Sequence, residues 1–137
     1  MEQENVDPDV RNTSGRTPLQ LAASNGHENV VKLLLKQENV DINSRDTNGV
    51  TSLECAAEDG CDAVVKIVLE QEDIIPDLQD DWGRTALWAA VAFGTEEVVR
   101  LLLERKDVDP NHSDKEGGTP LLHAAGFGRE GTLNLLR

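Results

Sequence analysis

A motif that returns every 34 residues constrains the fold of this 137-residue chain more than any other feature of its sequence. Residues 15–26 read GRTPLQLAASNG, and the threonine of this first copy, Thr17, recurs in register as Thr51, Thr85 and Thr119. The leucine two residues after the threonine and the glycine nine residues after it recur with the same spacing. A fixed period of this length indicates stacked supersecondary units that share one continuous core.

The period divides the chain into four units that follow one another without spacers. We expect a single array over residues 1–137, with repeat cores at about 13–46, 47–80, 81–114 and 115–137, the last one truncated. The segment QENVD at residues 3–7 recurs at residues 37–41, where it follows an apolar run. Because no such run precedes the first instance and no polar cap follows Arg137, we expect the chain to be part of a longer array.

Each unit reads as a polar turn followed by two short helices, which predicts an all-α architecture. The motif threonine can cap the first helix, and Pro18 and Pro120 suit a first helical position. That helix is rich in alanine, whose small side chain lets neighbouring backbones come close. Its end is marked by a glycine for which we expect left-handed geometry, at Gly26, Gly60, Gly94 and Gly128. A second, amphipathic helix follows, in which a lysine or arginine interrupts the apolar residues.

The combined pattern of Thr-Pro-Leu-x-x-Ala-Ala, a glycine, Val-Val-x-Leu-Leu-Leu and Val-Asp-x-Asn resembles the ankyrin repeat over essentially the whole chain. The resemblance implies an ankyrin-repeat solenoid of helix-turn-helix units with hairpin-like finger loops. It also implies a binding role, because such arrays hold protein partners on a concave face lined by the fingers and the first helices.

The chain departs from the family pattern in its period and in one polar position. The period is 34 residues here, against about 33 in the family, and the extra residue predicts a longer or differently shaped loop after the second helix. The family's histidine after Thr-Pro-Leu is replaced in every repeat, by Gln20, Glu54, Trp88 and Leu122. The hydrogen bonding between threonine and histidine that the family uses is therefore lost, which leaves the local rigidity of the repeat open.

The bulk composition narrows the classes of partner and the compartment. The formal net charge is −13, from 26 acidic and 13 basic residues, which argues against a nucleic acid partner because the phosphates would be repelled. The charge is compatible with a basic protein partner, but the favoured interpretation is that it only keeps the protein soluble. No apolar run approaches the ~20 residues of a membrane helix. With no secretory leader and two cysteines that form no disulfide framework, we expect an intracellular location, in the cytoplasm or else the nucleus.

No group of residues in the sequence predicts catalysis. The three histidines fall at unmatched positions of the repeats, and Cys55 and Cys61 lack nearby ligands for zinc. The glycines mark turns and form no phosphate-binding loop. Acidic pairs such as Asp80-Asp81 and Glu96-Glu97 are expected on solvated faces, and Cys55 is expected in the core. We therefore expect no catalytic residue, no metal, no cofactor and no small-molecule substrate.

The aromatic residues are the most informative departures from the repeat. All four, Trp82, Trp88, Phe93 and Phe127, lie in the third and fourth units. The resemblance implies that Trp82 at a fingertip, the adjacent Arg84, and Phe93 and Phe127 at the ends of first helices are partner contacts. Phe93 and Phe127 could instead fill gaps between repeats. Packing is the favoured interpretation of Trp88, which takes the place of the missing histidine.

In the first two repeats the corresponding positions are polar, and Asn48, Glu58 and Asp59 complete the predicted partner-binding set. A concave face that is acidic in one half and aromatic in the other suits a protein partner with an apolar anchor and a basic flank. Our interpretation of the sequence is therefore a non-catalytic protein-protein interaction module or scaffold. The alternative is a structural spacer array within a larger multidomain intracellular protein.

Overall fold

The computed structural model describes residues 6–137, so the start of the first QENVD segment lies outside the described residues. Within this range the chain forms eight helices and no strand. They are α1 (Pro18–Ser24), α2 (Glu28–Leu35), α3 (Ser52–Glu58), α4 (Asp62–Leu69), α5 (Ala86–Phe93), α6 (Glu96–Leu103), α7 (Pro120–Gly126) and α8 (Glu130–Leu136). The all-α repeat solenoid that the period predicts is confirmed.

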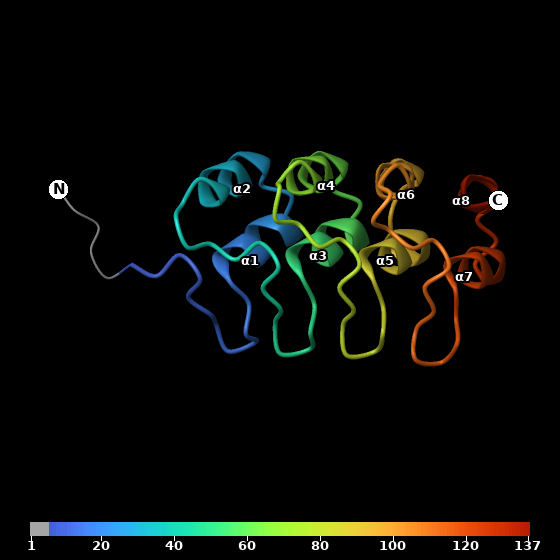
Figure 1. Ribbon diagram of the computed structural model, residues 1–137, viewed down its shortest axis with the longest axis horizontal. Coiled ribbons are helices and arrows are strands. Elements are labelled where there is room, and N and C mark those ends of the chain that lie inside the picture. The colour runs from blue at the N-terminus through green and yellow to red at the C-terminus, as the bar shows by residue number, and fades with distance from the viewer. Residues whose placement is uncertain (1–5) are drawn as a thin grey trace.

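The helices form two rows, and the loops between successive units form a third layer (Figure 1). One row holds the first helix of each unit, α1, α3, α5 and α7, and the other holds α2, α4, α6 and α8. Each helix packs on its partner in the same unit and on its equivalents in the adjacent units. The finger loops all extend from the same side of the first-helix row, so each unit contributes a finger and a first helix to one continuous face.

The predicted helix starts are confirmed by their capping geometry. In every unit the motif threonine is the N-cap of the first helix, and its hydroxyl accepts from the backbone N–H three residues on. In the first unit the cap is reciprocal, because the Gln20 side chain also accepts from the backbone N–H of Thr17 at 3.1 Å. Such caps stabilise a helix by about 1 kcal/mol each, a useful amount for helices of seven or eight residues.

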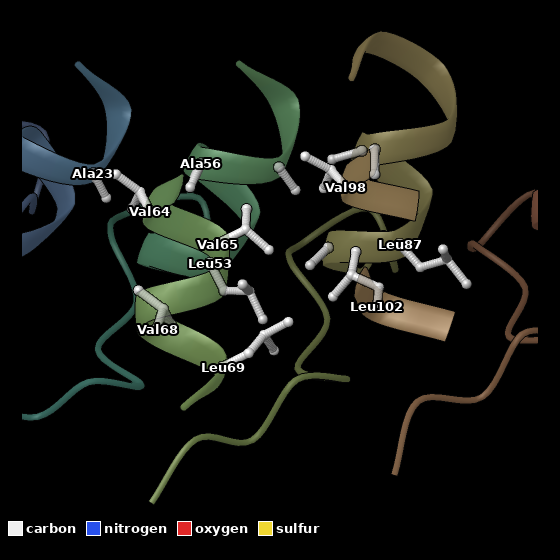
Figure 2. Packing of buried hydrophobic residues seen from close by; sticks show 14 of the residues in the cluster. Ala23, Leu53, Ala56, Val64, Val65, Val68, Leu69, Leu87, Val98 and Leu102 are labelled. Atoms are coloured by element: carbon white, nitrogen blue, oxygen red, sulfur yellow. The ribbon is translucent and has the colours of Figure 1, made fainter. Parts of the chain in front are cut away.

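The core runs through all the units and is built from the apolar positions of the repeat (Figure 2). Leu53 and Leu87, the motif leucines of the second and third units, are each 1% exposed. Val65 and Val98 reach the same core from the second helices, while Ala56 in α3 allows the neighbouring helix to approach. Each fully buried Leu or Val contributes about 1.5–3 kcal/mol. Because full burial of these residues requires the adjacent units, the stability of each unit depends on its neighbours.

The left-handed geometry expected of the glycines holds at three positions, and the prediction is wrong for Gly94. Gly26, Gly60 and Gly128 have φ values of 70°, 67° and 68°, whereas Gly94 has φ −88° and ψ −161°. Here α5 extends to Phe93, and the following Thr95 caps α6 through its hydroxyl. Gly94 is required for a different reason, because a Cβ atom there would lie 2.5 Å from the carbonyl oxygen of Ala57.

The fingers are hairpin-like turns that are joined to one another by their backbones. Each fingertip donates one N–H to a carbonyl of the preceding finger. These bonds run from Thr47 to Ser14 at 3.1 Å, from Asp81 to Asn48 at 2.9 Å and from Lys115 to Trp82 at 3.1 Å. The fingers therefore form a continuous layer whose exposed side chains lie in fixed register.

The loop after the second helix, where the extra residue was expected to change the shape, is not the same in all units. In the first unit Asn39 adopts φ 68°, the only positive φ of a non-glycine residue among residues 6–137. The equivalent Asp73 and Asp107 do not share this geometry. Asparagine tolerates the left-handed region better than most residues, because its short polar side chain can form local hydrogen bonds.

Candidate partner-binding surface

The orientation of each finger is set by an aspartate or asparagine five residues before the capping threonine. These residues are Asn12, Asp46, Asp80 and Asp114. In each one the Oδ1 atom accepts two backbone N–H groups from its own finger. In the third finger these come from Trp82 and Arg84, both at 2.9 Å. Sequence reasoning did not single out this position, although its 34-residue spacing was a sufficient signal.

In the third and fourth fingers the second carboxylate oxygen of this aspartate binds side chains of the surface. Asp80, which is 5% exposed, accepts from Nε of Arg84 at 2.8 Å. The guanidinium of Arg84 lies 4.5 Å from the ring centroid of Trp82 and 5.0 Å from that of Trp88. Arg84 was expected to contact a partner directly. The structure shows it half-buried between the two indole rings, where it fixes both of them.

Trp88 is held by the next finger. Its indole Nε1 donates to Oδ2 of Asp114 at 2.9 Å, and Nε2 of His123 lies 2.9 Å from the same oxygen. Burial alone would raise the pKa of Asp114, but hydrogen bonds from Gly118, His123 and Trp88 outweigh it and lower the pKa to about 2. Trp88 also packs against the core, which agrees with the favoured interpretation from the sequence.

Phe93 and Phe127 extend this group along the ends of the first helices. The ring of Phe93 meets Trp88 edge-on at a centroid distance of 5.9 Å, and Phe127 stacks on His123 at 6.0 Å. Trp88 and His123 are themselves 5.0 Å apart in edge contact. Phe93 is 54% and Phe127 53% exposed, so these rings do not fill gaps between repeats.

We call the connected group the aromatic shelf; its members are Trp82, Arg84, Trp88, Phe93, His123 and Phe127. It runs from the third fingertip to the ends of α5 and α7. Trp82 is half exposed, at 50%. Beside it lies an open hollow of about 210 Å³, lined by Trp82, Arg84, Trp88, Asp114, Lys115 and Glu116. Sequence reasoning missed His123, whose position four residues before Phe127 does not recur as histidine in the other units.

The three polar residues of the predicted set lie at the equivalent positions of the second unit. Asn48, Glu58 and Asp59 are all exposed. The backbone of Asn48 belongs to the layer of joined fingers, because its carbonyl accepts from Asp81. Oδ2 of Asp59 accepts from the hydroxyl of Ser24 at 3.2 Å. The polar and aromatic residues therefore occupy corresponding positions of successive units on the face formed by the fingers and first helices.

The position of the missing histidine connects adjacent units in the first three repeats. Gln20 donates to the carbonyl of Val50 at 2.6 Å, and Trp88 donates to Asp114. Glu54 is 3% exposed; burial first, and the neighbouring carboxylate of Asp80 second, raise its pKa to about 10. A pKa this high favours the neutral carboxyl of Glu54 at neutral pH, beside the carboxylate of Asp80. The neighbouring Glu54 and the hydrogen bonds from Arg84 outweigh the effect of burial on Asp80 and lower its pKa.

The expectation that Asp80-Asp81 and Glu96-Glu97 lie on solvated faces is therefore wrong for Asp80. Asp81, Glu96 and Glu97 are exposed, whereas Asp80 is buried at the base of the third finger. The reason is the finger turn itself, which needs an acceptor for two backbone N–H groups at that point. The buried carboxylate of Asp80 is tolerated because two backbone N–H groups and the guanidinium of Arg84 compensate its charge.

The cysteines and the acidic residues form no further site of note. Cys55 is 3% exposed, in the core as expected, and burial raises the pKa of its thiol to about 12. Cys61 is the N-cap residue of α4. Across residues 6–137, no three His, Cys, Asp or Glu side chains are grouped in a way that could hold a metal ion. In the same range, each helix is too short or too polar to cross a membrane.

Comparison with protein-family models gives one family. A model described as ankyrin repeats (3 copies) matches residues 1–80 and again residues 72–137, so the two matches together cover the chain. A comparison with curated proteins finds no match.

Proposed function

Because the chain belongs to the ankyrin-repeat family, we propose that it is a non-catalytic module or scaffold that binds a protein partner on its concave face. Ankyrin repeats are generally protein-protein interaction modules, and the family is typically non-catalytic. The face in question is the one formed by the fingers and the first helices. Its aromatic half, the aromatic shelf, would supply most of the binding energy.

The observation that carries this proposal is a set of half-exposed aromatic rings fixed by buried polar groups. Trp82, Phe93 and Phe127 each leave half or more of their surface in water, which a folded chain avoids unless something covers the rings. Tryptophan and arginine are enriched among the residues that dominate interface energies. Because Asp80 and Asp114 already hold Arg84 and Trp88 in place, little conformational entropy would be lost on binding.

The charge around the shelf supports a partner with an apolar anchor and a basic flank. Residues 47–114 carry 16 acidic and five basic side chains, a formal net charge of −11 of the total of −13. The acidity of the chain is thus concentrated in the two middle repeats. We further propose a cytoplasmic or nuclear location, because Cys55 and Cys61 are both free and reducing compartments keep thiols unpaired.

The test uses the whole chain as bait to capture and identify a partner, followed by calorimetry with two matched double variants. Trp82→Ala with Phe93→Ala removes two rings of the shelf, while Asn48→Ala with Asp59→Ala changes the equivalent positions one repeat earlier. We expect the first variant to weaken binding by about 100-fold or more and the second by about tenfold or less.

Unchanged binding by the Trp82→Ala, Phe93→Ala variant would refute the proposed binding face. If the bait recovers no specific partner, the alternative of a structural spacer is supported instead. Circular dichroism of both variants checks that the helices are retained, as expected for exposed side chains.

A further inference from the structure

One position at the end of the first helices changes from polar to aromatic along the array. It is occupied by Asn25, Asp59, Phe93 and Phe127. Asp59 caps α3, and Phe93 is the last residue of α5, the helix that packs on α3. Packed helices lie about 8–10 Å apart. A carboxylate that faces solvent is therefore one helix spacing from the exposed ring of Phe93, and the ring of Phe127 lies one spacing further on.

The position before it carries a small residue next to each of the two phenylalanines. It holds Ser24, Glu58, Ala92 and Gly126 in successive units. Ala92 is 3% exposed, and a Cβ atom added at Gly126 would meet nothing within 4 Å. The surface next to Phe127 is thus open, whereas beside Phe93 the carbonyl of the buried Ala92 accepts from Nη2 of Arg129 at 2.9 Å. The rings of Phe93 and Phe127 are themselves exposed, so an apolar side chain of a partner can contact them.

The charged side chains nearest to the shelf are mostly acidic. Glu58 and Asp59 lie on its N-terminal side, Asp81 precedes Trp82, and Glu116 occupies the next fingertip; all four are exposed. The charge of Arg84 is compensated by its ion pair with Asp80. Lys115 is the one exposed basic side chain that lines the hollow. A cationic group is therefore favoured beside the apolar contact, above all at Glu58 and Asp59.

We infer that the partner presents an extended segment in which one apolar side chain is accompanied by a lysine or arginine about three residues away. The separation of three residues follows because an extended chain rises about 3.3 Å per residue. Three residues therefore span one helix spacing of about 10 Å. The apolar side chain lies against the exposed ring of Phe93, one helix spacing from Asp59, and the cation pairs with Glu58 and Asp59. This inference rests on the proposed function and specifies the chemistry of the partner.

The chain offers its own optical probe, because Trp82 and Trp88 are its only tryptophans and both belong to the shelf. We suggest short synthetic peptides without tryptophan, with one phenylalanine in a glycine-serine background. Arginine is placed three residues before or after the phenylalanine, and a matched peptide carries glutamine instead. Binding to the whole chain is followed by tryptophan fluorescence and by the NMR signals of the two indole N–H groups.

We expect the better of the two arginine peptides to bind about three- to tenfold more tightly than the glutamine peptide at low salt. Glu58→Gln with Asp59→Asn should abolish this preference, as should high salt. Glu104→Gln, which neutralises the exposed cap residue of α6 in the other helix row, should leave it unchanged. Phe93→Ala with Phe127→Ala should weaken the binding of both peptides.

Equal affinity for the arginine and glutamine peptides would overturn the basic flank, although the apolar contact and the proposed function would stand. Indole signals that respond to none of the peptides would overturn the extended-segment inference as a whole. Neither result is the same as failure of the proposed function, which the calorimetry on the captured partner tests separately.

Discussion

The second and third repeats, residues 47–80 and 81–114, show how one scaffold carries two different surfaces. Thr51 and Thr85 cap their helices in the same way, and the finger aspartates accept the same pair of backbone N–H groups. The exposed positions at the fingertip and at the end of the first helix differ. The fingertip holds Asn48 in one and Trp82 in the other, and the helix end holds Asp59 and then Phe93.

The difference separates the residues that determine the fold from those that we propose for recognition. The threonine that caps the first helix and the leucine that packs in the core are the same in both repeats, and changing them would disturb a neighbouring unit as well. Side chains that face solvent contact no neighbouring unit in this way, so they can differ between repeats. The two repeats differ at a buried position too, where Glu54 faces Asp80 and Trp88 donates to Asp114. At this position burial favours the neutral carboxyl of Glu54 beside Asp80 in one repeat, and the indole of Trp88 donates to Asp114 in the other.

The largest effect is expected from the helix-ending glycines of these two repeats. Gly94→Ala places a Cβ atom 2.5 Å from the carbonyl oxygen of Ala57, and the backbone must shift, which we expect to cost about 3 kcal/mol or more. Gly60→Ala should cost only about 1–2 kcal/mol, the strain of alanine in the left-handed region. Urea unfolding of both variants measures the difference. Equal losses would mean that the two turns are built in the same way.

The second prediction concerns the buried acid of the second repeat. The pKa of Glu54 is raised from 4.5 to about 10 in the folded chain, so the unfolded chain releases a proton that the folded chain retains. The free energy of unfolding therefore falls as pH rises from about 4.5 towards 10. Glu54→Gln removes this loss and should stabilise the chain by up to about 3 kcal/mol at pH 7, with little gain below pH 4.5.

Unfolding curves at several pH values check this prediction, and the first repeat provides the control. Gln20 occupies the same position and donates to the carbonyl of Val50, so Gln20→Glu should introduce the pH dependence that Glu54→Gln removes. A gain from Glu54→Gln that does not vary with pH would show that Glu54 is ionised in the folded chain.

A smaller effect is expected at the start of the second helices. The hydroxyl of Thr95 accepts from the backbone N–H of Val98, whereas Cys61, at the same position of the second repeat, forms no side-chain cap. Thr95→Ala should lower the free energy of unfolding by about 1 kcal/mol, and Cys61→Ala by less. Chemical denaturation compares the two. A loss at Cys61 as large as that at Thr95 would mean that the cap adds nothing.

The smallest effect on stability is expected at the fingertips. Trp82 contacts Arg84 through its ring face and is otherwise exposed, so Trp82→Ala should cost about 0.5 kcal/mol. Asn48→Ala, the equivalent change in the second repeat, should lower the free energy of unfolding by about 0.5 kcal/mol or less. Thermal unfolding of the two variants measures both costs. A cost of several kcal/mol at Trp82 would mean that the ring is a structural residue and not a recognition residue.

Most of the scaffold could be predicted from the sequence because each element repeats its own signal. The period identifies the threonine caps, the buried leucines and the two helices of each unit without any knowledge of their contacts. The exception at Gly94 could not be predicted in this way. It depends on the approach of Ala57 from the preceding repeat and on the cap that Thr95 supplies, and neither is visible in a pattern that compares one glycine with the next.

The surface was harder to predict for a related reason. The exposure of Trp82, Phe93 and Phe127 followed from their positions in the repeat, but the groups that hold the shelf together did not. Asp80 and Asp114 look like members of an acidic, solvated finger, and only the folded turn shows that their carboxylates are enclosed. The partner contact expected of Arg84 stays a prediction, but its sequence position alone did not show that its guanidinium is bound by Asp80.

The central claim, that recognition lies in the third and fourth repeats on a scaffold common to all, is tested most directly by hydrogen exchange of the chain with and without its captured partner. The account predicts slower exchange at residues 81–93 and 115–127 in the complex, with little change at the equivalent residues 13–25 and 47–59. Equal protection of all four segments, or protection confined to α2, α4, α6 and α8, would contradict it.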